Sequence, residues 1–535
     1  MGNRSRRAVL GLLGLTGAAG ATAYALRDAG SAATTVTVGG PTATPEPTPT
    51  VIDPPVPATS SSIVAENRLP GSRKWIQYRD NSLCSSDVRG QIMGYASTTS
   101  AGHGELVDFH VSVRDGRDYR VAIYRIGDYG GTGARLMTTS EPLRGVRHPQ
   151  PPADPETGAI ECAWPVSWSL RIPESWMSGL YQAVFTADDG HRSSTPFVVR
   201  EPQRTSALLV VIPFATYQAY NMWPKDHRTG KNLYRGYLPN GKLGGTEHRA
   251  RKVSFDRPYS GSGVPSWFNM DSSFVRWAEA AGYDVTYASS LDLHDGTIDP
   301  ADYSAVVFPG HDEYWSRAMF DASMDAVRAG RDLAFLGANN VYFHVRMEPS
   351  SHTGVKDRLM ACYKSGHDPS PDAAGRTSRF REVQRDGSLA EQQLLGIQFI
   401  GIVPTDKPFP LIVKNADHWL WAGTGVRDGE KLPGLVGIEA DAYDPKAVEP
   451  AGATRTLLAE SPFKDSRPGV KHRTIQHTAH TEFPDGGSVF VAGTFHWPLA
   501  LVDGDSWADA RIKDRTARAK IRKATANLVD RMISR

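Results

Sequence analysis

The feature that most constrains the fold of this chain is a change of sequence rhythm near Arg204. Before it, short segments alternate apolar and polar residues with a period of two, which is typical of half-buried β-strands. After it, continuous apolar runs such as Ala207–Ile212 alternate with helix-like segments. A continuous apolar run is typical of a strand that is buried on both faces. The sequence therefore predicts a β-sandwich over residues 63–203 and a doubly wound, parallel α/β domain over residues 204–535.

The expected elements follow from these two patterns. The strands expected in the first domain are Leu106–Val113, Tyr119–Ile126, Leu180–Thr186 and Pro196–Val199, with turns at Asp115-Gly116 and at Asp188–Gly190. The strands expected in the second are Ala207–Ile212, Asp284–Ala288, Ala305–Phe308, Asp332–Leu336, Leu435–Glu439 and Ser488–Ala492. The expected helices are Ser273–Ala281, Arg317–Ala329 and a terminal helix over Ala510–Met532.

The first 62 residues are not expected to belong to either domain. Arg6 and Arg7 precede an apolar stretch over residues 8–26, so residues 1–30 resemble a twin-arginine export signal. An ordinary secretory signal and an uncleaved membrane anchor are the alternatives. Residues 31–62 are rich in Pro and Thr and lack an apolar period, which predicts a disordered linker. The expected location is therefore secreted or on the cell surface.

Charge and cysteine content exclude some classes of protein. The formal net charge is +2, so nothing suggests nucleic acid as a partner. The three cysteines are too few for a disulfide scaffold, although a bridge between Cys84 and Cys162 stays open. There is no G-x-S-x-G elbow, no H-E-x-x-H and no paired C-x-x-C.

Polar and aromatic residues follow several of the expected parallel strands. Tyr220 comes after the first strand, His311 and Glu313 after the third, and Glu439 ends a later one. Ligands of open α/β sheets bind beyond the carboxyl ends of the strands, so we expect these side chains to line one site. An imidazole and a carboxylate two residues apart suit a metal ligand and a proton carrier. The alternative is that this pair caps the next helix.

Five segments carry a resemblance to a known family: ENRLPG (Glu66–Gly71), GYAS (Gly94–Ser97), IYRIGDYGGTGARL (Ile123–Leu136), TYQAYN (Thr216–Asn221) and GHDEYW (Gly310–Trp315). Together they resemble the large subunit of N,N-dimethylformamidase. The second domain also resembles the glutamine-amidotransferase fold, in which a nucleophile would follow the strand ending at Leu336. Gly337-Ala338-Asn339 stands there without a cysteine, which argues against thiol catalysis.

The resemblance implies hydrolysis of a linear amide C–N bond, a small partner subunit and a single iron held by two tyrosines and a glutamate. Tyr220 and Glu313 match one tyrosine and the glutamate, with His311 and Glu439 in catalytic roles. Phe255 stands where the second tyrosine is expected, and Tyr259 is the nearby substitute. Loss of one phenolate predicts that the chain holds little iron, because ferric iron prefers anionic oxygen ligands.

Two functions stay open at this stage. The first is a metal-dependent amide hydrolase that acts on a small molecule. The second is a non-catalytic surface protein that binds a sugar-like ligand through exposed aromatic residues, namely Trp223, Trp267, Trp315 and Trp497. Homo-oligomerisation is compatible with both functions.

Overall fold

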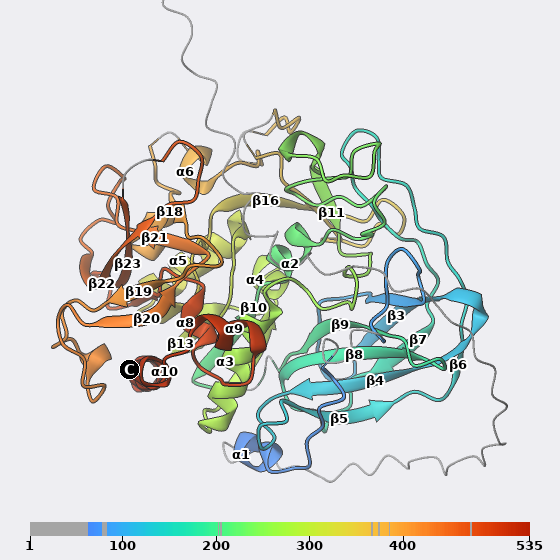
Figure 1. The fold of residues 1–535 in the computed structure, drawn as a ribbon, viewed down its shortest axis with the longest axis horizontal. Helices are drawn as coiled ribbons and strands as arrows, with labels where there is room; N and C mark the ends of the chain where they lie inside the picture. Colours follow the sequence, from blue (N-terminus) through green and yellow to red (C-terminus); the bar gives the residue numbers. More distant parts are fainter. Residues whose placement is uncertain are drawn as a thin grey trace, which may run out of the picture.

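The structure is a computed structural model that describes residues 62–76, 83–201, 203, 206–364, 367–372, 375–384, 386–470 and 473–535. The expected signal and almost all of the expected linker lie outside the described residues. No helix in the described ranges is long and apolar enough to cross a bilayer. The fold is mixed α/β, with many strands in several sheets and few long helices (Figure 1).

Two largely antiparallel sheets form the N-terminal part, drawn from blue to teal in Figure 1, with only β2 and β9 pairing parallel among the described strands. One sheet orders β1 (Ile92–Ala96), β3 (Leu106–Val113) and β7 (Trp168–Arg171). The other orders β2 (Ser100–Ala101), β9 (Arg192–Val199), β8 (Gly179–Ala187), β4 (Asp118–Ile126) and β5 (Ala134–Thr139), with β6 (Leu143–Arg144) beside β4. Apolar residues of both sheets share one buried cluster.

The turn at Asp115-Gly116 has a different role from the one its sequence suggests. It is a short 3-10 turn in which Asp115 has φ of 64°. Because β3 and β4 belong to different sheets, this turn carries the chain from one sheet to the other and closes no hairpin.

A larger sheet forms the middle of the molecule. Within the described residues its order is β12 (Val285–Ser289), β10 (Leu208–Ile212), β13 (Ala305–Phe308), β15 (Asp332–Phe335), β24 (Ser488–Val491), β23 (Arg473–Glu482) and β22 (Thr454–Lys464). The first five strands run parallel, and the last two pair antiparallel. Strand order reverses between β10 and β13, which is where ligands bind in open sheets.

Smaller sheets and helices surround this sheet. The four-stranded one orders β11 (Lys252–Ser254), β17 (Leu359–Ala361), β16 (Phe343–Glu348) and β14 (Tyr314–Ser316); β18 (Gln398–Ile402) pairs with β21 (Glu439–Ala442), and β19 (Phe409–Ile412) with β20 (Lys431–Val436). The helices are α1 (Ser62–Asn67), α2 (Phe214–Tyr220), α3 (Phe268–Ala280), α4 (Ser290–His294), α5 (Arg317–Arg328), α6 (Phe380–Val383), α7 (Glu391–Leu395), α8 (His496–Leu499), α9 (Ser506–Arg511) and α10 (Arg515–Ile533).

Two expectations about these elements are wrong. The strand expected over Leu435–Glu439 is divided between β20 and β21, because Ile438 has φ of 67°, and neither piece joins the large sheet. The expected terminal helix is divided into α9 and α10. The Asp514 side chain caps the start of α10 by accepting from the backbone N–H groups of Thr516 and Ala517. The bridge between Cys84 and Cys162 that the sequence left open does not form.

A buried ion pair joins the N-terminal sheets to the large sheet's helices. Arg125 on β4 makes two 2.8 Å hydrogen bonds to the carboxylate of Glu279 on α3, and both side chains have 0% exposure. Asn67 and Tyr287 donate to the same carboxylate, each at 2.8 Å. The carboxylate is therefore fully hydrogen-bonded, as a buried charge requires.

Candidate active site

Two strand-end segments of the large sheet meet at the point where its strand order reverses. Helix α2 begins two residues after β10, and the segment containing His311 and Glu313 follows β13. Thr216 and Tyr220 lie one turn apart on α2, so they share a face. The Thr216 hydroxyl accepts from the backbone N–H of Glu313 at 3.0 Å. This contact holds the backbone of Glu313 beside the face of α2 that carries Tyr220.

The centre of the site is a triangle of oxygens from Tyr220, Tyr234 and Glu313. The Tyr220 hydroxyl donates to Glu313 Oε2 at 2.7 Å, and the two phenolic oxygens lie 2.9 Å apart. Tyr234 also donates to Glu313 Oε2. The His311 Nε2 atom completes the group, 3.0 Å from the Tyr220 oxygen and 3.2 Å from Glu313 Oε2.

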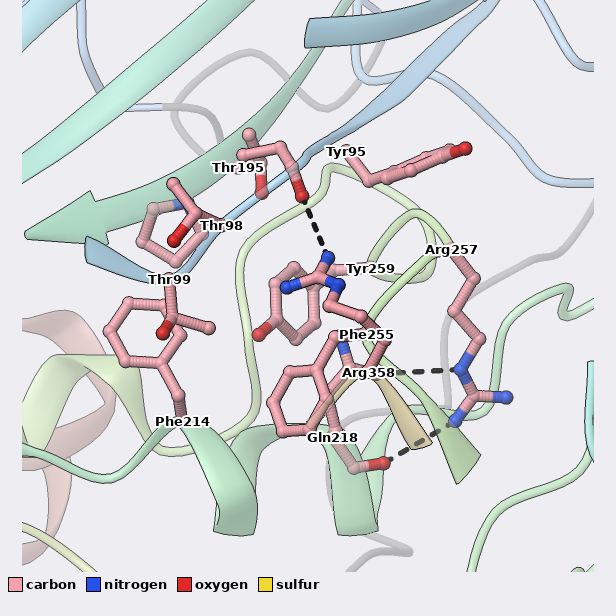
Figure 2. A pocket seen from close by; sticks show the side chains of 12 residues that line it. Tyr95, Thr98, Thr99, Thr195, Phe214, Gln218, Phe255, Arg257, Tyr259 and Arg358 are labelled. Atoms are coloured by element: carbon pink, nitrogen blue, oxygen red, sulfur yellow. Dashed lines mark hydrogen bonds between the residues drawn. The ribbon is translucent and has the colours of Figure 1, made fainter. Parts of the chain in front are cut away.

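Tyr234 is the member of this group that sequence reasoning missed. It lies between α2 and β11, in a segment without helical or strand periodicity, so no pattern marked it as a site residue. Tyr259 does not reach Glu313: its ring packs edge-on against Tyr217, with centroids 6.4 Å apart. Phe255 and Tyr259 instead line a separate buried cavity of about 10 Å³, which has room for about one water molecule (Figure 2). The second tyrosine of the cluster is therefore Tyr234, neither Tyr259 nor a residue at position 255.

The pair formed by His311 and Glu313 does not cap a helix. Strand β14 follows it, and α5 begins only at Arg317, where the Ser316 hydroxyl accepts from the backbone N–H of Met319. The His311 Nδ1 atom lies 3.1 Å from the carbonyl oxygen of Ala338, which can only accept. Nδ1 therefore carries a proton, and Nε2 faces the oxygen triangle.

Burial and neighbouring charges set the protonation of this group. Burial and the Glu313 charge hold the pKa values of Tyr220 and Tyr234 well above the usual phenol value. Burial alone would raise the pKa of Glu313, but its hydrogen bond to His311 and the imidazolium charge outweigh burial and lower it. Burial likewise opposes protonation of His311, yet Glu313 and Glu439 raise its pKa.

Glu439 lies at the start of β21, close enough to interact electrostatically with His311 and Glu313. Burial raises the pKa of Glu439 to about 8, and its buried Oε2 atom has no hydrogen-bond partner among the described residues. The structure thus brings together four of the five residues named from the sequence: Tyr220, His311, Glu313 and Glu439.

Lys364 is a further basic group at this site. Its ammonium lies over the ring of Tyr234, 3.7 Å from the centroid, and 4.2 Å from the centroid of Phe343. Burial lowers the pKa of Lys364 to about 8. No sequence pattern distinguishes this lysine.

The donor set fits a hard metal ion. Oxygen ligands about 2.0–2.1 Å from an octahedral ion lie about 2.8–3.0 Å from one another at right angles. Two sides of the triangle, 2.7 Å and 2.9 Å, are close to that spacing, and the third, between Tyr234 and Glu313, is shorter. The described residues hold no cluster of three His, Cys, Asp or Glu side chains suited to a metal. Two of the three candidate ligands here are tyrosines, which supply the anionic oxygens that ferric iron prefers.

The tryptophans do not form the exposed surface that the second function requires. Trp223, Trp315 and Trp497 have 0% exposure, and Trp267 packs edge-on against Phe495 with centroids 5.2 Å apart. The rings of Trp223, Trp315 and Trp497 fill the core and Trp267 is half-buried, so the expectation that the four form an exposed aromatic face is wrong.

The fold and the cluster together define a mixed α/β protein with a tyrosine–carboxylate site at the carboxyl edge of a largely parallel sheet. A family described as N,N-dimethylformamidase beta subunit-like, C-terminal, matches residues 120–509. This match covers well over half of the chain, and the chain belongs to that family.

Individual relatives are distant. The N,N-dimethylformamidase beta subunit of Alcaligenes sp is 22% identical over 405 residues, which cover 65% of this chain and 52% of the relative. The beta subunit from Paracoccus aminophilus is 24% identical over 221 residues, covering 35% of this chain and 29% of the relative. The chain thus spans at most about half the length of these curated relatives. A Paenibacillus sp. cycloisomaltooligosaccharide glucanotransferase aligns with a TM-score of 0.16 at 11% identity, covering 74% of this chain and 69% of the other, and the TM-score is too low to indicate a shared fold.

Proposed function

We propose that this protein is a metal-dependent hydrolase of a C–N bond in small linear amides. The observation that carries the proposal is the oxygen triangle of Tyr220, Tyr234 and Glu313 at the point where the strand order reverses. The matched relatives are named for action on N,N-dimethylformamide, which makes a small amide the first substrate to test. We also propose that residues 63–203 form a β-sandwich domain and that residues 204–535 form a doubly wound α/β domain.

The cofactor is proposed to be iron, held by Tyr220, Tyr234 and Glu313. The sequence suggested weak iron binding because Phe255 stood in for a tyrosine. Tyr234 removes that reason, since it places a second phenol against Glu313. A bound ion would supply Lewis acidity towards the amide carbonyl and lower the pKa of a water molecule.

The residues around the triangle are arranged to move protons. In amide hydrolysis water adds to the carbonyl carbon, the C–N bond breaks, and the amine leaves with a proton. His311 Nε2 faces the triangle, where the neutral form of the imidazole can accept the proton that water loses. Glu439, whose pKa is raised to about 8 by burial, holds a proton near neutral pH and can donate it to the departing nitrogen. The Lys364 ammonium, stacked on Tyr234, provides positive charge beside the developing anion.

Two arguments for the alternative of a non-catalytic surface protein lose weight. Tyr234 supplies a second phenol beside Glu313 where Phe255 offered none, and three of the four tryptophans suggested to bind a sugar are buried. Export by a twin-arginine signal is part of the proposal, because that route carries folded proteins and would allow the metal to be acquired in the cytoplasm. The relatives are named beta subunits, so we also propose a smaller partner subunit.

The test compares two tyrosine variants of the full chain. Purified protein is analysed for metal, for the visible phenolate-to-iron band and for release of amine from N,N-dimethylformamide. Tyr234→Phe should remove the metal, the band and the activity. Tyr259→Phe is the matched control, because Tyr259 is a buried tyrosine outside the triangle, and it should retain all three. Metal that survives Tyr234→Phe, or full-length protein without stoichiometric metal, would overturn the proposal.

A further inference from the structure

Asn232 connects the two tyrosines of the candidate site through their backbones. Its side-chain N–H donates to the carbonyl oxygen of Tyr220 at 3.0 Å. Its side-chain oxygen accepts from the backbone N–H groups of Tyr234 and Arg235, both at 2.9 Å. The side chain is only 4% exposed, so water does not compete for these bonds.

The contact to Tyr220 is what distinguishes Asn232 from an ordinary turn residue. An asparagine oxygen commonly accepts from the N–H two residues later, which only shapes a local turn. Here the amide of the same side chain also reaches back 12 residues to the last residue of α2. One planar group therefore holds the end of a helix and the start of a loop at a fixed separation.

Further hydrogen bonds hold the backbone around Asn232 against the end of α2. The N–H of Leu233 donates to the carbonyl of Ala219 at 3.1 Å, which adds a second contact between the loop and α2. Arg257, fully buried, donates to the carbonyl of Asn221 at 3.0 Å and to that of Lys231 at 3.1 Å. Figure 2 shows Arg257 beside Gln218 of α2, to which it is also hydrogen-bonded.

Arg257 donates to three main-chain carbonyls and to the Gln218 side chain, and it has no salt bridge to a carboxylate among the described residues. Besides Gln218, its bonds end on Asn221, directly after Tyr220, and on Lys231, directly before Asn232. The segment that presents both phenols is therefore held at each end, and Asn232 is the group that spans the gap between the two tyrosines.

We propose that Asn232 is a positioning residue that sets the spacing of the Tyr220 and Tyr234 oxygens for metal binding. The proposal rests on the proposed function, because it gives Asn232 a role in the affinity of that same site. Ligands must be held within about 0.5 Å of their productive positions, and groups that orient ligands typically contribute about 10–100-fold in metal affinity. Asn232 touches no reacting atom and acts only through the two tyrosine backbones.

The experiment measures ferric iron affinity and the visible phenolate band in the full chain with Asn232→Ala. We expect an affinity about 10–100-fold weaker and a shifted or weakened band. Asn232→Ser is the second variant, because a serine hydroxyl can still accept from the Tyr234 N–H but is too short to reach the Tyr220 carbonyl. It should keep the fold and lose affinity to a similar degree.

Asn67→Ala is the matched control. Asn67 also accepts from two consecutive backbone N–H groups, Asp128 at 2.7 Å and Tyr129 at 3.2 Å, and donates to the carbonyl of Ile63 at 2.9 Å, but it lies in the α1 region. Because Asn67 also donates to the buried Glu279 carboxylate, Asn67→Ala should lower the melting temperature at least as much as Asn232→Ala does, and it should leave iron affinity and the band unchanged. Affinity within about twofold of wild type in both Asn232 variants would overturn the positioning role.

A second measurement separates failure of this proposal from failure of the proposed function. If the wild-type chain binds no iron, the proposed function fails, and amide hydrogen exchange in metal-free protein still tests Asn232. Exchange at Tyr234 and Arg235 should accelerate in Asn232→Ala, while exchange at Asp128 and Tyr129 stays unchanged. Unchanged exchange at Tyr234 and Arg235 would show that Asn232 does not hold this segment.

Discussion

The phenolic oxygens of Tyr220 and Tyr234 lie 2.9 Å apart, and both hydroxyls donate to the same oxygen of Glu313. In water two phenols gain little from such an arrangement. In the buried site, each hydroxyl must find an acceptor, and a single carboxylate oxygen serves both. The arrangement that gives both hydroxyls an acceptor in the absence of metal also presents three oxygen ligands once the phenols lose their protons.

Iron affinity is expected to rise with pH. Burial and the Glu313 charge hold both tyrosine pKa values well above the usual phenol value, so both phenols are protonated near neutral pH before metal binds. Binding as phenolates releases these protons, which strengthens affinity by up to about tenfold per proton for each pH unit. Titration against a competing chelator between about pH 6 and pH 8 measures this slope. A flat profile would show that the phenols are not ligands.

Glu439→Gln is expected to slow amide hydrolysis without removing metal. Glutamine keeps the shape of the side chain but cannot release a proton, and loss of a general acid typically costs about 10²–10⁴-fold in rate. Steady-state kcat and iron content are measured on the same preparation. Glu460→Gln is the control, because Glu460 pairs with Lys414 at the protein surface. Equal activity of the wild type and Glu439→Gln would remove Glu439 from the mechanism.

Asp271→Asn is expected to flatten the pH dependence of stability. Burial raises the pKa of Asp271 from 3.8 to about 8, with the Tyr217 hydroxyl donating to it at 2.6 Å. Because the folded-state pKa of Asp271 is raised, its contribution to the free energy of unfolding is complete below about pH 4 and is lost as the pH rises through about 8. The wild-type free energy of unfolding should fall across that window, by at most about 1.4 kcal/mol per pH unit from this group. Urea unfolding at several pH values compares Asp271→Asn with the exposed control Asp321→Asn; identical slopes would contradict the prediction.

Glu279→Gln is expected to destabilise the protein strongly. The substitution leaves the Arg125 guanidinium buried without a counter-charge, and removing one partner of a buried pair costs about 3–5 kcal/mol. Asp321→Asn is the matched control again, because it breaks an exposed pair with Arg317 and should change the free energy of unfolding by less than about 1 kcal/mol. Denaturant unfolding checks both values. A cost below about 1 kcal/mol for Glu279→Gln would mean that the pair does not hold the two parts together.

Export is expected to depend on Arg6 and Arg7. The twin-arginine route requires the arginine pair before the apolar stretch, whereas the general secretory route accepts lysine. Replacing both arginines by lysine should therefore abolish export, measured as the fraction of protein outside the cytoplasm. Undiminished export would indicate the general secretory route.

The sequence by itself determined the five parallel strands of the large sheet and one side of the site. Ala305–Phe308 is a strand with the predicted bounds, because a short run of apolar residues must be buried on both faces. The carboxyl-edge rule then placed Tyr220, His311 and Glu313 together without any knowledge of contacts. These predictions succeeded because each depends on local periodicity and on the geometry common to parallel strands.

Only the tertiary structure decided the second tyrosine, the lysine and the groups that hold them. Tyr234 and Lys364 lie on segments without periodicity, and their positions follow from long-range contacts such as the bond from Asn232 to Tyr220. The break at Ile438, which directs Glu439 into β21 instead of the large sheet, is also invisible in an apolar run. Local pattern reports which face of an element is buried, whereas the meeting point of two irregular segments depends on the packing of the whole chain.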